Sequence, residues 1–169
     1  MAHWLVRLCK HRLLDEGDAR RLLDKEALAR IEARVAASEA RHNGEIRVVV
    51  EAGLPLSYLR RGASARERAI AMFGKLGVWD TERNNGVLVY LLLAERAIEI
   101  VADRGVDRLV DASEWAAIAE GMKGAFQGGN FEAGLLRAVD AVDALLVRHF
   151  ARLAGSADVN ELPDAPVVR

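Results

Sequence analysis

Acidic and amide side chains fall in three segments that a small sheet would bring together at one edge. One segment leads into a first valine-rich strand, one precedes a second apolar strand, and one follows a third strand. A parallel pair begins at one edge of a sheet, and an antiparallel third strand ends at that same edge. The residues concerned are Asn43, Glu45, Asp80, Glu82, Asn84, Asn85, Asp103, Asp107 and Asp111.

Converging carboxylate and amide oxygens are the ligands that hard cations such as calcium and magnesium prefer. We therefore assign a candidate site for Ca²⁺ or Mg²⁺, with Asp80, Asn84, Asp103, Asp107 and Asp111 as its ligands. Like charges brought together repel unless a cation or an arginine balances them. Several arginines are close enough in sequence to do so, which makes an ion-pair network the alternative: Arg47, Arg83, Arg104 and Arg108.

Motifs of the common catalytic centres are absent from the chain. The sequence has no Walker loop, no G-x-G-x-x-G, no H-E-x-x-H and no C-x-x-C. The spacing Asp80-x-Glu82-x-Asn84 is not an EF-hand, because the glycine is misplaced and Leu91 stands at the twelfth position. Cys9 is the single cysteine, and the four histidines are too scattered to predict a zinc site.

Two further chemistries stay open at the level of sequence. In a metal-assisted phosphatase, Asp80, Asp103 and Asp111 would hold the ion and Arg104 would steady the phosphate. Ligands of open α/β sheets usually bind at the carboxyl ends of the parallel strands. That end carries residues that could hold an anion: Ser57, Tyr58, Arg60 and Arg61.

The elements that must position these residues follow from hydrophobic spacing and end signals. We predict strands over 45–50, 87–93 and 97–102, and helices over 25–42, 112–127 and 131–150, with another helix behind Ser64. Asp24 and Asn130 are expected to cap helices, and Ser64 with Glu67 and Asp111 with Glu114 are expected to form capping boxes. Trp79 and Tyr90 are expected in the core.

The element order predicts an α/β fold, a three-layer α/β/α sandwich around a small mixed sheet. The first β-α-β unit implies a right-handed crossover between parallel strands, and the short turn at 94–96 implies an antiparallel hairpin. We divide the chain into an amino-terminal helical arm (1–23), the α/β domain (24–153) and an extended carboxy-terminal tail (154–169). The arm is amphipathic and either docks on the domain or contacts a partner or a membrane surface.

Composition bounds the function classes. The 169 residues are 51% hydrophobic and 29% charged, which suits one globular domain. The formal net charge of −1 argues against a nucleic-acid binder, which would carry a basic excess. No apolar run approaches the length of a membrane span, and the single cysteine favours a cytoplasmic location.

A family resemblance rests on motifs whose order and spacing match over roughly residues 44–150. They are Gly77-Val78-Trp79-Asp80-Thr81, Asn84-Asn85-Gly86-Val87-Leu88-Val89-Tyr90-Leu91, Ile98-Glu99-Ile100-Val101-Ala102-Asp103-Arg104-Gly105, Asp111 with Trp115, and Gly129-Asn130-Phe131-Glu132-Ala133-Gly134-Leu135. Together they resemble the TPM domain family. The arm and the tail segment Asn160-Glu161-Leu162-Pro163-Asp164 resemble a bacterial subgroup without a signal peptide.

The resemblance implies an α/β/α fold, with acid phosphatase activity proposed for plant members, calcium binding for some members, and roles in membrane-protein repair or assembly for others. Asp111 matches an acidic position of the family, whereas Asp103 stands where many relatives carry Gly. Our first hypothesis is a binding or assembly module that acts on another protein through the arm and is tuned by a divalent ion. The alternative is the metal-assisted acid phosphatase.

Overall fold

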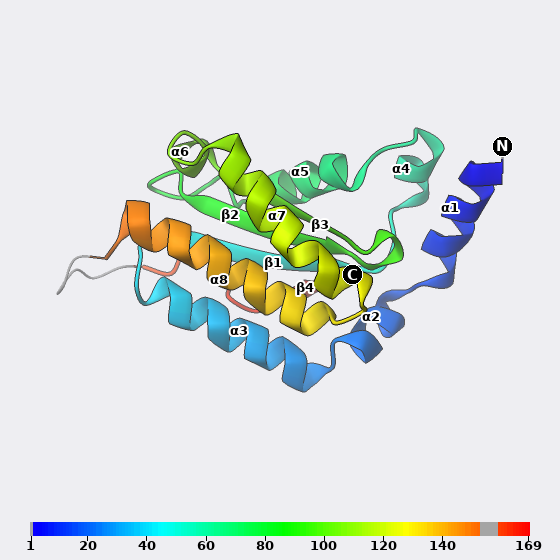
Figure 1. Cartoon of the computed structure of the whole chain (residues 1–169), viewed down its shortest axis with the longest axis horizontal. Helices are drawn as coiled ribbons and strands as arrows, with labels where there is room; N and C mark the ends of the chain where they lie inside the picture. The colour runs from blue at the N-terminus through cyan, green and yellow to red at the C-terminus, as the bar shows by residue number, and fades with distance from the viewer. Residues whose placement is uncertain (1, 153–158) are drawn as a thin grey trace.

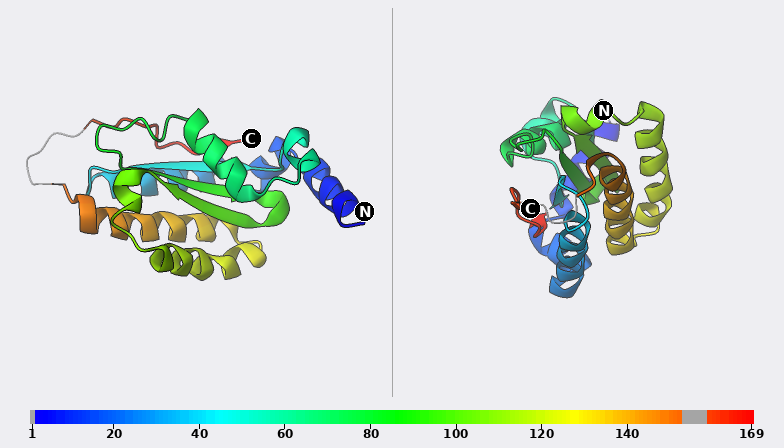
Figure 2. Two further views of the ribbon diagram at one scale, coloured as in Figure 1. Left: turned by 90° about the horizontal axis from the view of Figure 1, so that it is seen from above. Right: turned by 90° about the vertical axis from the view of Figure 1, so that its left-hand side faces the viewer.

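The computed structural model describes residues 2–152 and 159–169, and its elements form three layers around one sheet. One layer holds α3, α7 and α8, and the opposite layer holds α5 together with the carboxy-terminal tail (Figures 1 and 2). The predicted α/β/α sandwich is therefore confirmed. The elements are α1 (Ala2–Leu13), α2 (Glu16–Leu22), α3 (Lys25–Glu39), β1 (Glu45–Glu51), α4 (Leu56–Arg60), α5 (Ala65–Lys75), β2 (Gly86–Leu92), the 3₁₀ turn η1 (Leu93–Glu95), β3 (Ala97–Ala102), α6 (Arg104–Asp107), α7 (Ala112–Gln127), α8 (Phe131–Phe150) and β4 (Val167–Val168).

The sheet has the order β3-β2-β1-β4. β1 and β2 are parallel, with Glu45 opposite Gly86, and β2 and β3 are antiparallel, with Val87 opposite Ala102. Every residue of β1 and β2 is buried, as expected for strands whose two faces are covered by helices. The sequence analysis did not foresee β4, which pairs parallel with β1 through Val167 and Val168.

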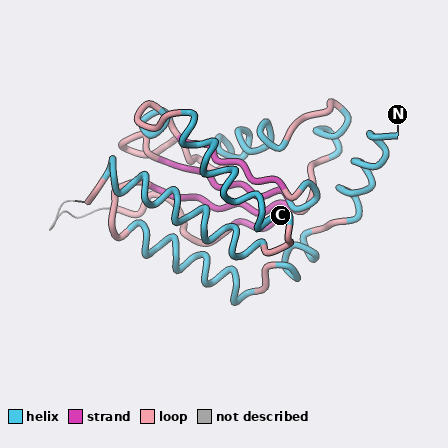
Figure 3. The backbone as a smooth tube through the Cα atoms, in the orientation of Figure 1, coloured by secondary structure: helices cyan, strands magenta, loops and turns pink. Residues whose placement is uncertain are grey.

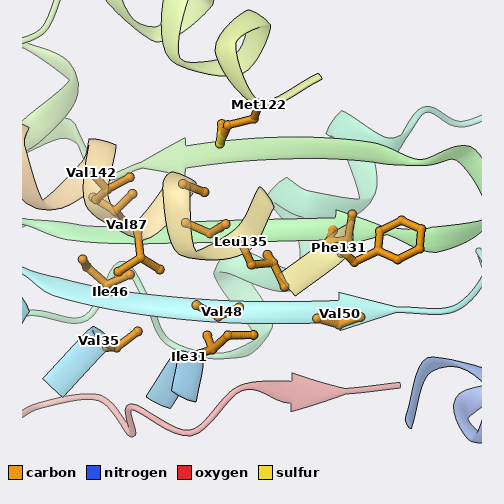
Figure 4. Close-up of a cluster of buried hydrophobic side chains, with 14 of the residues drawn as sticks. Ile31, Val35, Ile46, Val48, Val50, Val87, Met122, Phe131, Leu135 and Val142 are labelled. Atoms are coloured by element: carbon orange, nitrogen blue, oxygen red, sulfur yellow. The ribbon is translucent and has the colours of Figure 1, made fainter. Parts of the chain in front are cut away.

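Alternation along the strands separates two apolar clusters, one on each face of the sheet. The larger cluster joins α3 and α8 to the sheet and includes Ile31, Val48 and Leu135 (Figure 4). The smaller one, on the other face, joins α5 to residues such as Leu88 and Tyr90. Tyr90 is fully buried as predicted, but the expectation for Trp79 was wrong. Its side chain is 54% exposed because the indole Nε1 bonds back to Gly74 O at 3.2 Å in a surface loop.

The hydrogen bonds at the helix ends show which of the predicted caps form. Asp24 accepts a hydrogen bond from Ala27 N, and Ser64 forms a complete capping box with Glu67. Asp111 does occupy the N-cap position of α7, but its side chain makes no capping hydrogen bond, so the capping box predicted there was wrong. Its carboxylate is exposed and is solvated at low cost without the backbone amides.

Both ends of the chain return to the domain. Ala19 and Leu23 of the α2 segment are fully buried in the larger cluster, while α1 lies farther out along the molecule (Figure 1). Residues 159–166 run as irregular backbone into β4 on the α5 side (Figure 3). Within the described residues, no helix combines the length and the apolar character that crossing a membrane requires.

Candidate cation site at the amino-terminal edge of the parallel strands

The predicted edge exists, and backbone hydrogen bonds hold its loops together. Asp103 N donates to Gly86 O at 2.8 Å, and Gly105 N donates to Asn84 O at 2.9 Å. A Cβ at Gly105 would lie 2.3 Å from Asn84 O, so this approach of two backbones requires glycine. Residues 103–105 therefore lie directly beside residues 84–86, as the antiparallel hairpin predicts.

Two side-chain oxygens at this edge are buried without a hydrogen-bond partner among the described residues, Asn85 Oδ1 and Asp103 Oδ2. Asn85 is 0% exposed, and its amide nitrogen donates a hydrogen bond to Asn43 O at 2.5 Å. Asp103 uses its other oxygen, Oδ1, to accept from Arg104 N at 2.7 Å. An unsatisfied buried acceptor costs about 1–3 kcal/mol. Carboxylate and amide oxygens are both ligand types that a hard cation accepts.

Three of the five predicted ligands are brought together. Asn84 and Asp103 lie on the two facing loops, and Asp107 follows one helical turn later, with its N–H donating to Asp103 O at 2.9 Å. The side-chain oxygen of Asn84 already accepts from Arg104 Nε at 3.1 Å, so an arginine does compete for this edge.

The remaining two predicted ligands, Asp80 and Asp111, are exposed, and in the described part of the chain their side chains form no hydrogen bond or ion pair with this group. Across residues 2–152 and 159–169, no three His, Cys, Asp or Glu side chains form a group that could hold a metal ion. A cation at this edge would therefore need amide oxygens as well as carboxylates. The sequence analysis placed Asn85 at this edge but named only the neighbouring Asn84 as a ligand.

Glu45, which was also predicted at this edge, binds the tail instead. Its carboxylate oxygens accept from Glu161 N at 3.2 Å and Leu162 N at 3.1 Å. Two positions along the strand, Arg47 donates to Pro163 O and, at 2.6 Å, to Ala165 O. Two charged side chains of a buried strand thus bind main-chain groups of the tail. The charged residues at alternate positions of β1 were the signal available in the sequence.

At the opposite edge, two of the four residues considered for anion binding, Tyr58 and Arg61, are engaged in the protein itself. The Arg61 guanidinium lies 4.5 Å from the centre of the Tyr58 ring and pairs with Glu67 at 2.7 Å. Beneath them, the Glu51 carboxylate accepts two hydrogen bonds from Arg68, at 2.9 and 2.6 Å. It also accepts one from Tyr90 Oη at 2.6 Å, and burial with this carboxylate raises the Tyr90 pKa.

A serine, a histidine and an aspartate meet between α3 and α8, in an arrangement that superficially suggests a hydrolase. Ser38 Oγ lies 2.8 Å from His42 Nε2 and donates to Asp143 Oδ1 at 2.8 Å. Ser38 and His42 are both 0% exposed, so no substrate can reach the hydroxyl. Burial lowers the His42 pKa to about 4, and His42 Nδ1 accepts from Gly44 N at 3.1 Å. The group is a buried network that fixes the turn into β1, and the Asp143 carboxylate also pairs with Arg41 at 2.6 Å.

These features define a mixed-sheet α/β/α sandwich with an amide- and carboxylate-rich loop edge. The model of the TPM domain matches residues 17–145. The chain belongs to the TPM domain family.

Solved structures agree with this assignment. The BA42 protein of the psychrophilic bacterium Bizionia argentinensis is 26% identical over 86% of this chain and 94% of that one, with a TM-score of 0.74. The amino-terminal domain of a P. gingivalis protein is 23% identical over 78% of this chain and 83% of that one, with a TM-score of 0.63. The amino-terminal domain of cg2496 from Corynebacterium glutamicum is 15% identical over 80% and 79%, with a TM-score of 0.56, and these last two show the fold alone. No curated protein sequence matches the chain.

Proposed function

We propose that this TPM domain is a binding or assembly module that contacts another protein through α1. The observation that carries the proposal is the apolar surface of this helix. Trp4, Leu5, Val6 and Leu13 are 46%, 53%, 56% and 79% exposed. Large apolar side chains grouped on one exposed element are typical of an interaction surface.

The helix is also held in a defined place. Arg7 Nε pairs with Glu95 at 2.7 Å, and its second nitrogen donates to Ala63 O at 2.6 Å. His11 is buried, accepts from Leu54 N at 3.0 Å through Nδ1, and lies 3.0 Å from Glu95 through Nε2. A helix fixed in this way offers its apolar side chains to a partner without a large ordering cost.

The test compares the full chain with a variant lacking residues 2–13, which leaves the buried α2 in place. We expect the truncated chain to unfold cooperatively, with a circular-dichroism spectrum that loses only the helical signal of α1, and to lose capture of its protein partner in affinity purification. The matched control replaces Ile70, an exposed apolar residue of α5, with Ser. Undiminished capture by the truncated chain would refute α1 as the contact element. Loss of sedimentation with anionic phospholipid vesicles, with no protein partner affected, would assign the helix to a membrane surface instead.

We propose further that a divalent cation, Ca²⁺ or Mg²⁺, binds at the loop edge and tunes this module. Asp103 Oδ2 and Asn85 Oδ1 support the proposal as buried acceptors without partners, and Asp107 supplies a nearby carboxylate. The ion would supply positive charge where the folded chain leaves these oxygens unpaired. It binds only the native state, so it raises the unfolding temperature by mass action.

The cation test is thermal unfolding of chelator-treated protein with and without millimolar CaCl₂ or MgCl₂. We expect a rise that disappears in Asp103→Asn and persists in Asp80→Asn, whose side chain is exposed and apart from the edge. No rise with either ion would refute the cation site. Ion-dependent hydrolysis of p-nitrophenyl phosphate that Asp103→Asn abolishes would favour the metal-assisted phosphatase over the binding module.

A further inference from the structure

The outer edge of β3 presents main-chain groups that no strand of the described chain pairs. In an antiparallel pair, alternate residues bond to the partner strand and the others point away. Asp103 N bonds to Gly86 O, and the register places Val101 opposite Leu88. The residues that bond to β2 are therefore the odd-numbered ones. The N–H and C=O groups that point outward belong to Ile98, Ile100 and Ala102.

One of these outward groups already accepts a hydrogen bond from a side chain. The Arg66 guanidinium reaches across from α5 and donates to Ile100 O. A side chain thus supplies the hydrogen bond that a neighbouring strand would give. Proteins commonly protect an open edge with charged side chains, and Arg66 has that effect at one carbonyl.

The edge lies in a groove rather than on an open surface. A cavity of about 410 Å³ follows β3 between Arg66 of α5 and Trp115 of α7, and a second cavity of about 630 Å³ continues it toward Arg96 and Phe126. Its apolar wall comes from both the sheet and α7: Ile98, Ile100, Val110, Trp115 and Ala119. Trp115 Nε1 is buried here and has no hydrogen-bond partner among the described residues.

The chemistry of this groove selects an extended peptide. Outward N–H and C=O groups at every second residue match the main chain of one added strand, and Trp115 offers apolar surface beside it. A second copy of the domain fits poorly, because α5 and α7 both pack against β3 and would meet their counterparts across the edge. Glu99 and Asp107 line one cavity and Glu95 and Glu120 the other, so carboxylates outnumber the lining arginines Arg66 and Arg96. Glu99 pairs with Arg66 and Glu95 with Arg7.

We propose that this β3 groove binds an extended, basic peptide segment of another protein, which adds a strand to the sheet. Backbone hydrogen bonds to Ile98, Ile100 and Ala102 hold the segment. Its alternate apolar side chains enter the wall beside Trp115, and its basic side chains face the carboxylates. The main-chain groups of β3 lie outside α1, but Glu95 at the far end of the groove pairs with Arg7 of α1, so the test uses the full chain.

The experiment titrates the ¹⁵N-labelled full chain with an acetylated, amidated heptapeptide of alternating Lys and Val. The control is the same peptide N-methylated at alternate residues on its hydrogen-bonding edge, so that it cannot donate there. We expect the unmodified peptide to shift the amide signals of Ile98, Ile100 and Ala102 and the indole N–H signal of Trp115. N-methylation should abolish these shifts.

Trp115→Phe removes part of the apolar wall of the groove, so we expect it to weaken binding about fivefold. Trp79→Phe, at an exposed indole in a surface loop, serves as the matched control and should leave affinity unchanged. Equal binding of the methylated peptide, shifts that avoid β3, or no binding at millimolar peptide would each overturn the proposal. The titrations with the unmodified and the methylated peptide use the unaltered chain, so they test the proposal even if Trp115→Phe folds poorly.

Discussion

Glu39 should make the stability of the domain fall as pH rises above neutrality. Its carboxyl is 8% exposed at the end of α3, and Oε1 accepts from Ile46 N at 2.8 Å. Burial raises the Glu39 pKa to about 9, with the nearby charges of Glu45 and Asp164 acting in the same direction. The folded chain therefore holds a proton at neutral pH that an unfolded glutamate releases near its ordinary pKa of 4.5.

The sign and size of the effect follow from this difference. The contribution of Glu39 is fully present below the unfolded pKa and is lost as pH rises through the folded one. The slope approaches about 1.4 kcal/mol per pH unit, so raising pH by about two units above 6.5 should remove about 3 kcal/mol. Below about pH 6.5 the slope is masked, because burial lowers the His42 pKa to about 4 and histidine protonation there favours the unfolded chain.

The assay is urea unfolding at a series of pH values for the wild type and Glu39→Gln. Gln keeps the acceptor for Ile46 N and cannot titrate, so the variant should lose the alkaline decline. Glu32→Gln, at an exposed position of the same helix, should retain it. A wild-type stability that is flat from about pH 6.5 to 8.5, or an equal decline in Glu39→Gln, would refute the reasoning.

Two other substitutions probe the packing of the sheet and its helices. Arg68→Met leaves the Glu51 carboxylate buried without its cation, and we expect a loss of about 3–5 kcal/mol in urea unfolding; a loss below about 1 kcal/mol would mean that water replaces the arginine. Gly134→Ala places a Cβ 2.5 Å from the Phe126 ring, which should cost about 1–3 kcal/mol. Gly124→Ala, where a Cβ meets no atom within 4 Å, should be neutral or stabilising by up to about 1 kcal/mol, and equal thermal shifts for the two variants would contradict this contrast.

The features that were predictable from sequence depend on short-range signals. The valine run of β1, the apolar run of β2 and the turn before Ala97 specified a parallel pair and a hairpin, and these placed Asn84, Asp103 and Asp107 at one edge. The Ser64 capping box also needs only residues three apart and forms as predicted. Local spacing was sufficient wherever the contact partners are close in sequence or dictated by strand order.

The features that escaped prediction depend on partners that are distant in sequence. Nothing near Glu45 indicates that its carboxylate binds amides of residues 161 and 162, and nothing near Glu51 indicates Arg68 and Tyr90. Asp111 followed a capping pattern, but an exposed carboxylate gains little by capping when water solvates both groups. The orphan oxygen of Asn85 is visible only in three dimensions.

The placement of β4 has a consequence for how the chain is made. Arg47 and Ala165, which bond across β1 and the tail, are 118 residues apart, so the sheet cannot be completed until the last residues leave the ribosome. Until then Glu45 and Arg47 have no main-chain groups of the tail to bind. Water must solvate these two charged side chains, although the finished fold buries the strand that carries them. Premature termination before residue 160 would therefore release a chain whose β1 edge is open. Such an edge promotes aggregation and is a binding site for quality-control factors.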